Sequence, residues 1–265
     1  MIAPIPYALL EEWLADHGPS LLLCSARLLP VSYLCPLFGG QVAPSIVRLA
    51  WTCSFAASLH FTGGVSVAPF HGDYGSLTLG VFSELTLGMV LGLVAALPFD
   101  SARIGGRFID LFRGASAEAS LPQVGIKESA SGDILFQLLL AMVSAGPGYA
   151  AIAGALWKSF ALVKLGLFSS NQGVALEVVG LTGGALATGL CIGAPIAAAG
   201  LALDGLVGVV SRISSGLSLR DSIVPMRLLG GAAMMWLGIG LILNRLTDQV
   251  FKSSLDVIQL IRLVR

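Results

Sequence analysis

Apolar residues gather into six long segments, separated by shorter stretches rich in polar residues, glycine or proline. The segments cover residues 20–38, 46–61, 76–97, 134–157, 178–210 and 226–243. A helix of about 20 apolar residues crosses the hydrocarbon core of a bilayer. The pattern therefore predicts an all-α membrane protein, in which the short Gly- and Pro-containing connection at residues 39–45 joins the first two helices as a hairpin.

Two regions after residue 170 depart from this simple plan. Residues 178–210 are too long for one perpendicular crossing and contain Pro195, so we expect either one long bent helix or a broken pair. Residues 245–265 place apolar and charged side chains on opposite sides at helical spacing. This spacing predicts an amphipathic terminal helix.

A polar insert interrupts the apolar pattern at residues 98–133. It carries four of the fifteen basic residues and five of the fifteen acidic residues. Its first part predicts an amphipathic helix with i, i+3 charge pairs, Asp100 with Arg103 and Arg107 with Asp110. After Gly114 the chain is rich in Gly, Ala and Ser, which favours a mobile or ligand-moulded loop. Length alone leaves a solvated connection and a functional loop equally open.

Composition agrees with the membrane class and excludes another. Hydrophobic residues make up 55 % of the chain, charged residues only 11 %, and the mean hydropathy is +0.88, outside the usual range of soluble domains. The formal net charge is zero and no basic cluster is present, so we expect no nucleic-acid partner. The first residues are acidic rather than basic, and we expect no cleaved signal peptide. The four cysteines lie in apolar surroundings and are expected to be buried free thiols.

The distribution of Lys and Arg gives no consistent topology. The stretches before Arg27 and between residues 61 and 74 lack both residues, which suggests an outside N-terminus and a cytoplasmic insert. Continued alternation then leaves Lys158, Lys164 and the basic terminal helix on the outer side. Either the segment count is wrong or the helices do not cross the bilayer in ordinary up-and-down fashion.

Three ionisable residues stand out in or directly beside the apolar segments: Glu84, Asp204 and Arg212. Charges at such positions are costly and face protein or water rather than lipid. Each shares a helical stripe with glycines four residues apart, which predicts closely packed faces. Arg27 and Arg48 are candidate partners within the chain. We interpret the three charges as contributions to helix or subunit packing, and a role in an ion or proton pathway stays open.

Enzyme signatures are missing from the sequence. It contains no Gly-x-Ser-x-Gly, no His-Glu-x-x-His and no phosphate-binding loop, and His17, His60 and His71 are scattered. We therefore expect no catalytic residues, no metal site and no cofactor, and predict a protein that is not an enzyme.

A series of shorter features follows in order from about residue 20 to residue 245. They are Pro36-Leu37-Phe38, Val47-Arg48, Glu84-Leu85, Gly88, Pro98-Phe99, Gly106, Ile109-Asp110, Arg113-Gly114-Ala115, Pro122, Gly125, Gly193-Ala194-Pro195-Ile196, Asp204, Ser211-Arg212 and Pro225-Met226-Arg227. Together they resemble the SctT/FliR family of export-apparatus subunits in bacterial type III secretion and flagellar systems, with a central pattern closest to virulence-type members. The chain departs from the family pattern where Leu121 replaces an acidic residue and where the Pro-Gln-x-Asn run after Arg212 is absent.

The resemblance implies a non-enzymatic core subunit of an inner-membrane export gate, with helical hairpins stacked around a pore and raised toward the periplasmic face. Such a position would account for the topology conflict. The implied partners are SctR/FliP-like and SctS/FliQ-like subunits, SctU/FlhB-like and SctV/FlhA-like proteins, unfolded secreted substrates and membrane lipid. The chain is then one helical export-apparatus domain over residues 1–265, divided into N-terminal hairpins (20–97), an amphipathic helix and plug loop (98–133), C-terminal hairpins (134–244) and a terminal helix (245–265).

The insert is similar to the family's plug, a loop that helps to keep the pore closed. The resemblance assigns the plug to Gly114, Ala115, Ser116, Ala117, Glu118, Ala119, Ser120, Leu121, Pro122 and Gly125. Its base is assigned to Arg107, Asp110 and Arg113. The alternative is a small ion-coupled secondary transporter that uses Glu84 and Asp204. A transporter of this kind is expected to show paired repeats with interrupted helices, and only one interruption, at Pro195, is visible.

Overall fold

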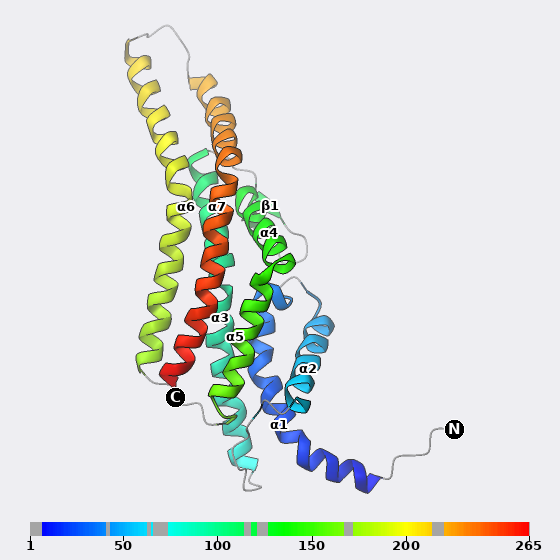
Figure 1. Ribbon diagram of the computed structural model, residues 1–265. Helices are drawn as coiled ribbons and strands as arrows, with labels where there is room; N and C mark the ends of the chain where they lie inside the picture. The colour runs from blue at the N-terminus through cyan, green and yellow to red at the C-terminus, as the bar shows by residue number, and fades with distance from the viewer. Residues whose placement is uncertain are drawn as a thin grey trace, which may run out of the picture. The chain divides into compact units, whose positions relative to one another are not determined.

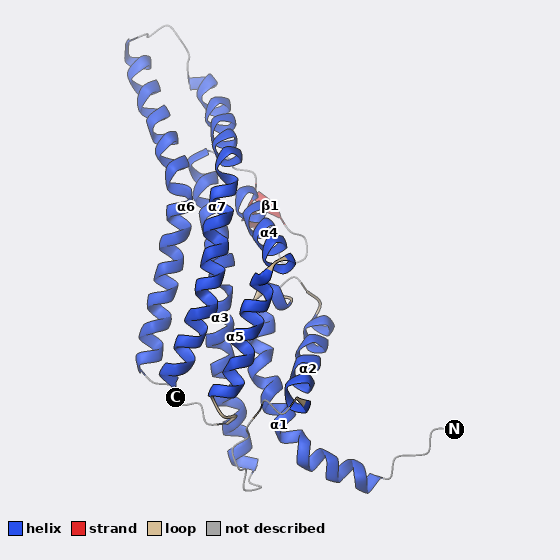
Figure 2. Cartoon of the chain, viewed as in Figure 1, coloured by secondary structure: helices blue, strands red, loops and turns tan. Residues whose placement is uncertain are grey.

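The computed structural model describes residues 7–40, 43–62, 65, 74–113, 118–120, 127–166, 172–213 and 220–264. Helices dominate these residues, and the all-α prediction is confirmed apart from two very short strands (Figures 1 and 2). In chain order the elements are α1 (Tyr7–Leu34), the 3-10 turn η1 (Pro36–Phe38), α2 (Ser45–Phe61), α3 (Tyr74–Arg113), β1 (Glu118–Ser120), β2 (Lys127–Ser129), α4 (Ala130–Ala145), α5 (Pro147–Leu162), α6 (Gln172–Ile213) and α7 (Arg220–Val264).

Several helices are longer than the hydrophobic pattern predicts. The third apolar segment and the charged first part of the insert form one helix, α3. The long fifth segment is the single continuous helix α6, which includes Pro195. The sixth segment and the amphipathic terminal stretch are likewise one helix, α7. Polarity therefore changes along these helices without ending them, because backbone hydrogen bonds within a helix do not depend on which side chains face lipid, protein or water.

The fourth predicted segment is not one helix. Helices α4 and α5 meet at a bend of 75°. Gly146 at the end of α4 has an extended backbone, and Pro147 begins α5 at a position where its missing N–H is tolerated. The bend therefore follows from the pair Gly146-Pro147, which the prediction from apolar residues did not take into account.

Among the described residues, three helical stretches are long and apolar enough to cross a membrane. They are Gly75–Arg113, Gln172–Val210 and Arg227–Val264, and the bent pair α4–α5 would make a fourth. The first two apolar segments, at residues 20–38 and 46–61, are not among these stretches. Large apolar side chains such as Leu206, Trp236 and Leu237 lie exposed on α6 and α7, as expected for a membrane protein with faces turned to lipid or to other helices.

The chain divides into two compact units. Unit 1 comprises Met1–Ala96, Ala150–Val179 and Ser253–Arg265, and unit 2 comprises Leu97–Tyr149 and Gly180–Lys252. The core of unit 1 contains buried side chains from α1, α2, α5 and the turn that follows α5: Leu23, Cys24, Leu28, Ala56, Leu59, Phe160 and Leu165. Cys24 and Cys35 are buried as expected, whereas Cys53 and Cys191 are exposed.

Within unit 1, α1 and α3 pack almost backbone to backbone. A Cβ atom on Gly88 would lie 2.2 Å from the carbonyl oxygen of Arg27, and one on Gly92 would lie 3.0 Å from the Cα of Val31. The residue numbers rise together along both helices, so the two helices run parallel at this crossing. The glycine stripe beside Glu84 is therefore a packed face, as its spacing predicts.

Unit 2 uses small residues in the same way. A Cβ atom on Gly105 would lie 3.0 Å from the carbonyl oxygen of Gly189, and one on Gly193 would lie 2.6 Å from the ring of Phe108. The Ser101 hydroxyl donates to the Ala185 carbonyl at 2.9 Å. Together these contacts hold the second half of α3 parallel to α6.

The close approach at Gly88 generates a stability prediction. We expect Gly88→Ala to lower the free energy of unfolding by about 1–3 kcal/mol, because the new methyl group overlaps the Arg27 backbone. The matched control is Gly154→Ala in α5, where nothing lies within 4 Å of the added atom. The measurement is thermal or denaturant unfolding in a mild detergent, and equal losses in the two variants would contradict the packing account.

Candidate functional site

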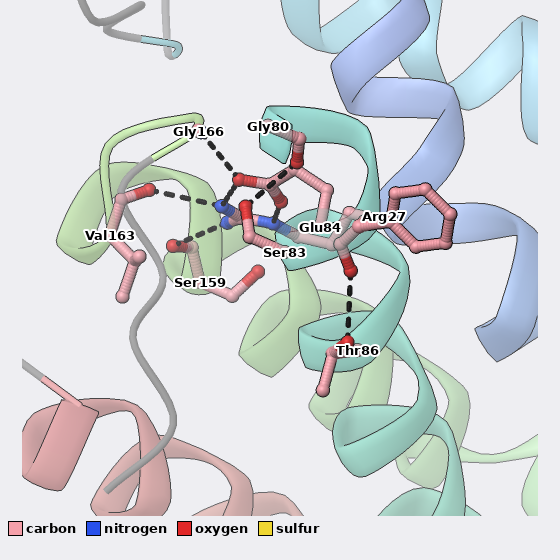
Figure 3. Close-up of polar contacts among 9 residues, drawn as sticks. Arg27, Gly80, Ser83, Glu84, Thr86, Ser159, Val163 and Gly166 are labelled. Carbon is pink, nitrogen blue, oxygen red and sulfur yellow. Dashed lines mark hydrogen bonds and ion pairs between the residues drawn. The ribbon is translucent and has the colours of Figure 1, made fainter. Parts of the chain in front are cut away.

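A buried ion pair links α1 and α3 in unit 1 (Figure 3). Arg27 Nε donates to Glu84 Oε2 at 2.5 Å, and Arg27 Nη2 donates to Glu84 Oε1 at 3.1 Å. The Arg27 side chain is 1 % exposed and the Glu84 side chain is fully buried. The sequence expectation that Arg27 could neutralise Glu84 is met by a two-point contact, the strongest geometry that these groups can form.

The end of α5 and the following turn complete this pair. Arg27 Nη1 donates to the Ser159 carbonyl at 3.0 Å, and Nη2 donates to the Val163 carbonyl at 3.3 Å. The guanidinium also lies 4.5 Å from the ring centre of Phe160. A cation is favoured here because the last carbonyl groups of a helix carry partial negative charge. The backbone N–H of Gly166, a residue with φ of +81°, donates to Glu84 Oε1 at 2.7 Å.

The arrangement leaves little freedom for the two charges. Four of the five guanidinium N–H groups have acceptors, and both carboxylate oxygens are occupied. Removal of either partner would leave a charge buried without compensation. The pair is therefore suited to joining α1, α3 and α5, and Glu84 is poorly suited to bind and release an ion.

A second polar cluster lies where the central insert returns to the helices, in unit 2. The backbone N–H and the hydroxyl of Ser131 donate to the two oxygens of Asp110 at 2.9 and 2.5 Å. Arg113 Nη1 donates to the Ser131 hydroxyl at 2.9 Å and lies 3.4 Å from Asp110 Oδ1. The Ser129 hydroxyl accepts from the Gly132 N–H and caps α4. We call Asp110, Arg113, Ser129 and Ser131 the hairpin base.

Close packing adds to these hydrogen bonds. A Cβ atom on Gly106 would lie 2.2 Å from the Cα of Gly132, so the first turn of α4 rests directly on α3. Asp110 is buried, which strengthens its contacts with Ser131 relative to the same contacts in water. The start of α4 is thus firmly attached to the end of α3.

The proposed plug-base residues differ in their placement. Asp110 and Arg113 belong to the hairpin base, whereas Arg107 is exposed on α3 and does not form the expected pair with Asp110. The i, i+3 partner of Asp110 is Arg113 instead. Ser131 is a contact that the sequence reasoning missed, although Ser129 followed by Gly132 and Asp133 is a recognisable helix start.

Most of the proposed plug residues lie outside the described part of the chain. Gly114, Ala115, Ser116, Ala117, Leu121, Pro122 and Gly125 belong to this group. Glu118, Ala119 and Ser120 form strand β1, which pairs antiparallel with β2 so that Glu118 lies opposite Ser129 and Ser120 opposite Lys127. A region expected to be loop therefore contains a short β-ladder next to the hairpin base.

The remaining predicted charges lie in a more open region of unit 2. Asp204 on α6 pairs with Arg227 on α7, and their side chains are 40 % and 27 % exposed. Arg212 and Gly208 are exposed on α6, so the expectation of a packed face is not met around them within this chain. Arg227 was overlooked as the partner because it lies 23 residues after Asp204 in the sequence, and the family-like Pro225-Met226-Arg227 stretch was the available signal.

Two histidines that look scattered in the sequence lie together in unit 1. His60 Nε2 is 2.8 Å from His17 Nδ1, and His60 Nδ1 is 2.9 Å from the Ser20 hydroxyl. The Ser20 hydroxyl also donates to the His17 carbonyl at 2.8 Å. Among the described residues, no group of three or more His, Cys, Asp and Glu side chains is placed to hold a metal ion.

Comparison with known proteins gives one family match. The model of the family described as bacterial export proteins, family 1, matches residues 19–253. The Yop proteins translocation protein T of Yersinia pestis is 29 % identical over 154 residues, which cover 56 % of this chain and 58 % of the relative. The flagellar biosynthetic protein FliR of Bacillus subtilis is 28 % identical over 160 residues, 60 % of this chain and 61 % of the relative. The chain thus spans about three fifths of the length of these relatives.

The contrast between the two ion pairs is testable. We expect Glu84→Gln to lower the free energy of unfolding by about 3–5 kcal/mol, because Arg27 would remain buried without a counter-charge. The matched change Asp204→Asn should cost less than about 1 kcal/mol, because both partners in that pair are partly exposed. Denaturant unfolding of the purified variants measures both values. A loss in Asp204→Asn as large as that in Glu84→Gln would contradict the assigned roles.

Proposed function

Because this chain belongs to family 1 of the bacterial export proteins, we propose that it is a non-enzymatic core subunit of a type III protein secretion export gate in the bacterial inner membrane. The observation that carries the proposal is the family match over residues 19–253, which includes both ion pairs and the central insert. In this role the chain forms part of the pore through which unfolded proteins pass, and energy for transport comes from other components.

We further propose that the central insert is the plug of this pore. A plug needs a firm attachment and a part that separates at low cost. The attachment is the hairpin base, where Asp110 receives two hydrogen bonds from Ser131 and Gly106 contacts Gly132 directly. The part that separates is the ladder of β1 and β2, which has only three residue pairs. Two-stranded hairpins of this size are marginally stable, so a passing chain could open the ladder without disturbing α3 or α4.

Sister subunits are the proposed neighbours of α6. Several glycines on this helix, among them Gly180, Gly183 and Gly184, have nothing within 4 Å of an added Cβ atom. Exposed Leu186 lies on the same part of the helix. Small residues allow close approach of another apolar helix. We assign this surface to SctR/FliP-like and SctS/FliQ-like subunits, and SctU/FlhB-like and SctV/FlhA-like proteins complete the proposed apparatus.

The transporter alternative gains no support from the two acidic residues it requires. Glu84 is held by Arg27 and the Gly166 N–H, and Asp204 pairs with Arg227. Helix α6 continues through Pro195, where a transporter would be expected to have an interrupted helix. We therefore retain the export-gate proposal alone.

Removal of the first part of the insert tests the plug proposal. We expect deletion of residues 116–120, which removes β1, to make resting cells leak small molecules while the export complex still assembles. Uptake of a membrane-impermeant dye measures leakage, and co-purification with the sister subunits measures assembly. Unchanged permeability in an assembled complex would refute the plug assignment.

A point variant tests the hairpin base. Asp110→Asn replaces one acceptor oxygen by an NH₂ group, so the side chain at position 110 can no longer accept hydrogen bonds from both Ser131 donors on separate oxygens. We expect assembled complexes that leak less than the deletion but clearly more than the unmodified protein. Arg107→Gln is the matched control, because Arg107 is exposed on the same helix. Equal leakage in the two point variants would argue against a role for the hairpin base.

A further inference from the structure

Among the described residues, Arg48 is a cation without a counter-charge. Between residues 28 and 72 it is the only Asp, Glu, Lys or Arg in the sequence. Glu84, its expected candidate partner, is already bound at both oxygens by Arg27. No acidic side chain of the described residues pairs with Arg48, and its Nε atom is buried without a hydrogen-bond acceptor. A partly buried charge in this condition is costly, and such charges in apolar helices usually mark functional positions.

The Arg48 side chain lines a pocket of about 250 Å³ between α1 and α2. The pocket is formed by Leu29, Ser32, Tyr33, Ser45, Arg48, Leu49 and Thr52. The Arg48 guanidinium lies 4.9 Å from the ring centre of Tyr33. This contact and the packing of its stem against Gly39 fix the position of the charge without neutralising it. The Arg48 guanidinium is therefore kept at the pocket, where a ligand can bind it.

Some polar groups of the pocket already form hydrogen bonds within the protein, and others are available to a ligand. The hydroxyls of Ser32 and Thr52 donate to the carbonyls of Leu29 and Arg48. Ser45 begins α2, where the N–H groups of Val47 and Arg48 donate to the Pro44 carbonyl and those of Ser45 and Ile46 have no acceptor within the helix. Within the part of the chain that the structure describes, no side chain caps this end of α2, and no acidic residue lies in its first turn. The available donors are thus the Arg48 guanidinium, the Ser45 hydroxyl and the N–H groups of Ser45 and Ile46, a set suited to an oxyanion with several oxygens.

The rim of the pocket is apolar. Leu29 and Leu49 line the pocket and are 46 % and 53 % exposed, and Ile46, which follows Ser45 on α2, is 77 % exposed. A soluble phosphate would leave these side chains in water, whereas a ligand with acyl chains would cover them. Arg and Tyr side chains at the end of an apolar hairpin are also typical of the depth at which lipid headgroups lie. From these observations we propose that the pocket beside Arg48 binds the phosphate group of a membrane phospholipid, with its acyl chains along the exposed leucines.

This site does not depend on the plug proposal, and its test uses the full chain in a mild detergent. The probe is dioctanoyl phosphatidylglycerol, and bound lipid is followed by native mass spectrometry and by the shift in Tm. We expect Arg48→Gln to weaken binding about tenfold or more, as for loss of a charge-assisted hydrogen bond. Arg48→Lys should retain part of the affinity, and Ser45→Ala should weaken it roughly fivefold. Lys158→Gln, which removes an exposed charge from α5, should bind like the unmodified protein.

Two further probes separate the sources of binding. Dioctanoylglycerol has the same acyl chains without phosphate, and inorganic phosphate has no acyl chains. We expect neither to give an Arg48-dependent shift, and an equal shift with either would overturn the proposal. Equal lipid affinity in Arg48→Gln and the unmodified protein would also overturn it. If the assembled complex binds no lipid through Arg48, and Arg48→Gln instead releases a sister subunit, then the ligand is a protein carboxylate and the lipid proposal is wrong.

Discussion

The burial of one arginine and one glutamate constrains the whole of unit 1. Once Arg27 and Glu84 lose contact with water, each requires the other, and the guanidinium also requires the carbonyls of Ser159 and Val163. These demands fix the rotation of α1, α3 and the end of α5 about their axes. Gly88 then has to lack a side chain, because the two-point contact brings the helix backbones too close for a Cβ atom. A single electrostatic pair thus determines where small residues are needed.

In unit 2, neutral and charged groups together hold the insert to α3 and α4. The insert begins in α3 and ends in α4. Where these helices meet, the carboxylate of Asp110 accepts hydrogen bonds from the N–H and the hydroxyl of Ser131. The backbone contact between Gly106 and Gly132 excludes water from the junction. A segment that separates and re-forms needs such a boundary, because local opening otherwise spreads into the neighbouring helices. The asymmetry between a firm base and a short ladder is the physical support for the proposed gate.

Residue patterns predicted the helical class and gave Arg27 and Arg48 as the two candidate partners of the intramembrane charges, because apolar runs and such charges carry strong energetic penalties when misplaced. They did not predict the length of α3, since the change from apolar to charged residues near residue 98 does not interrupt a helix. The bend at Gly146 and Pro147 was missed because hydropathy averages over both residues. Contacts made by backbone groups, such as the Gly166 N–H on Glu84, leave no periodic signal in the side chains. The pairing of His17 with His60 depends on how α1 and α2 align, which local spacing does not determine.

The register of β1 and β2 has a kinetic consequence. All three residue pairs form within residues 118–129, so the partners of each pair are separated by at most 11 positions along the chain. Closure of such a small loop requires no long-range search, and β-hairpins form in about 1–10 μs. The ladder can therefore re-form faster than most domain movements, which take microseconds to milliseconds. If it is the gate, the time during which ions could cross after each transported protein is set by hairpin closure rather than by rearrangement of the long helices.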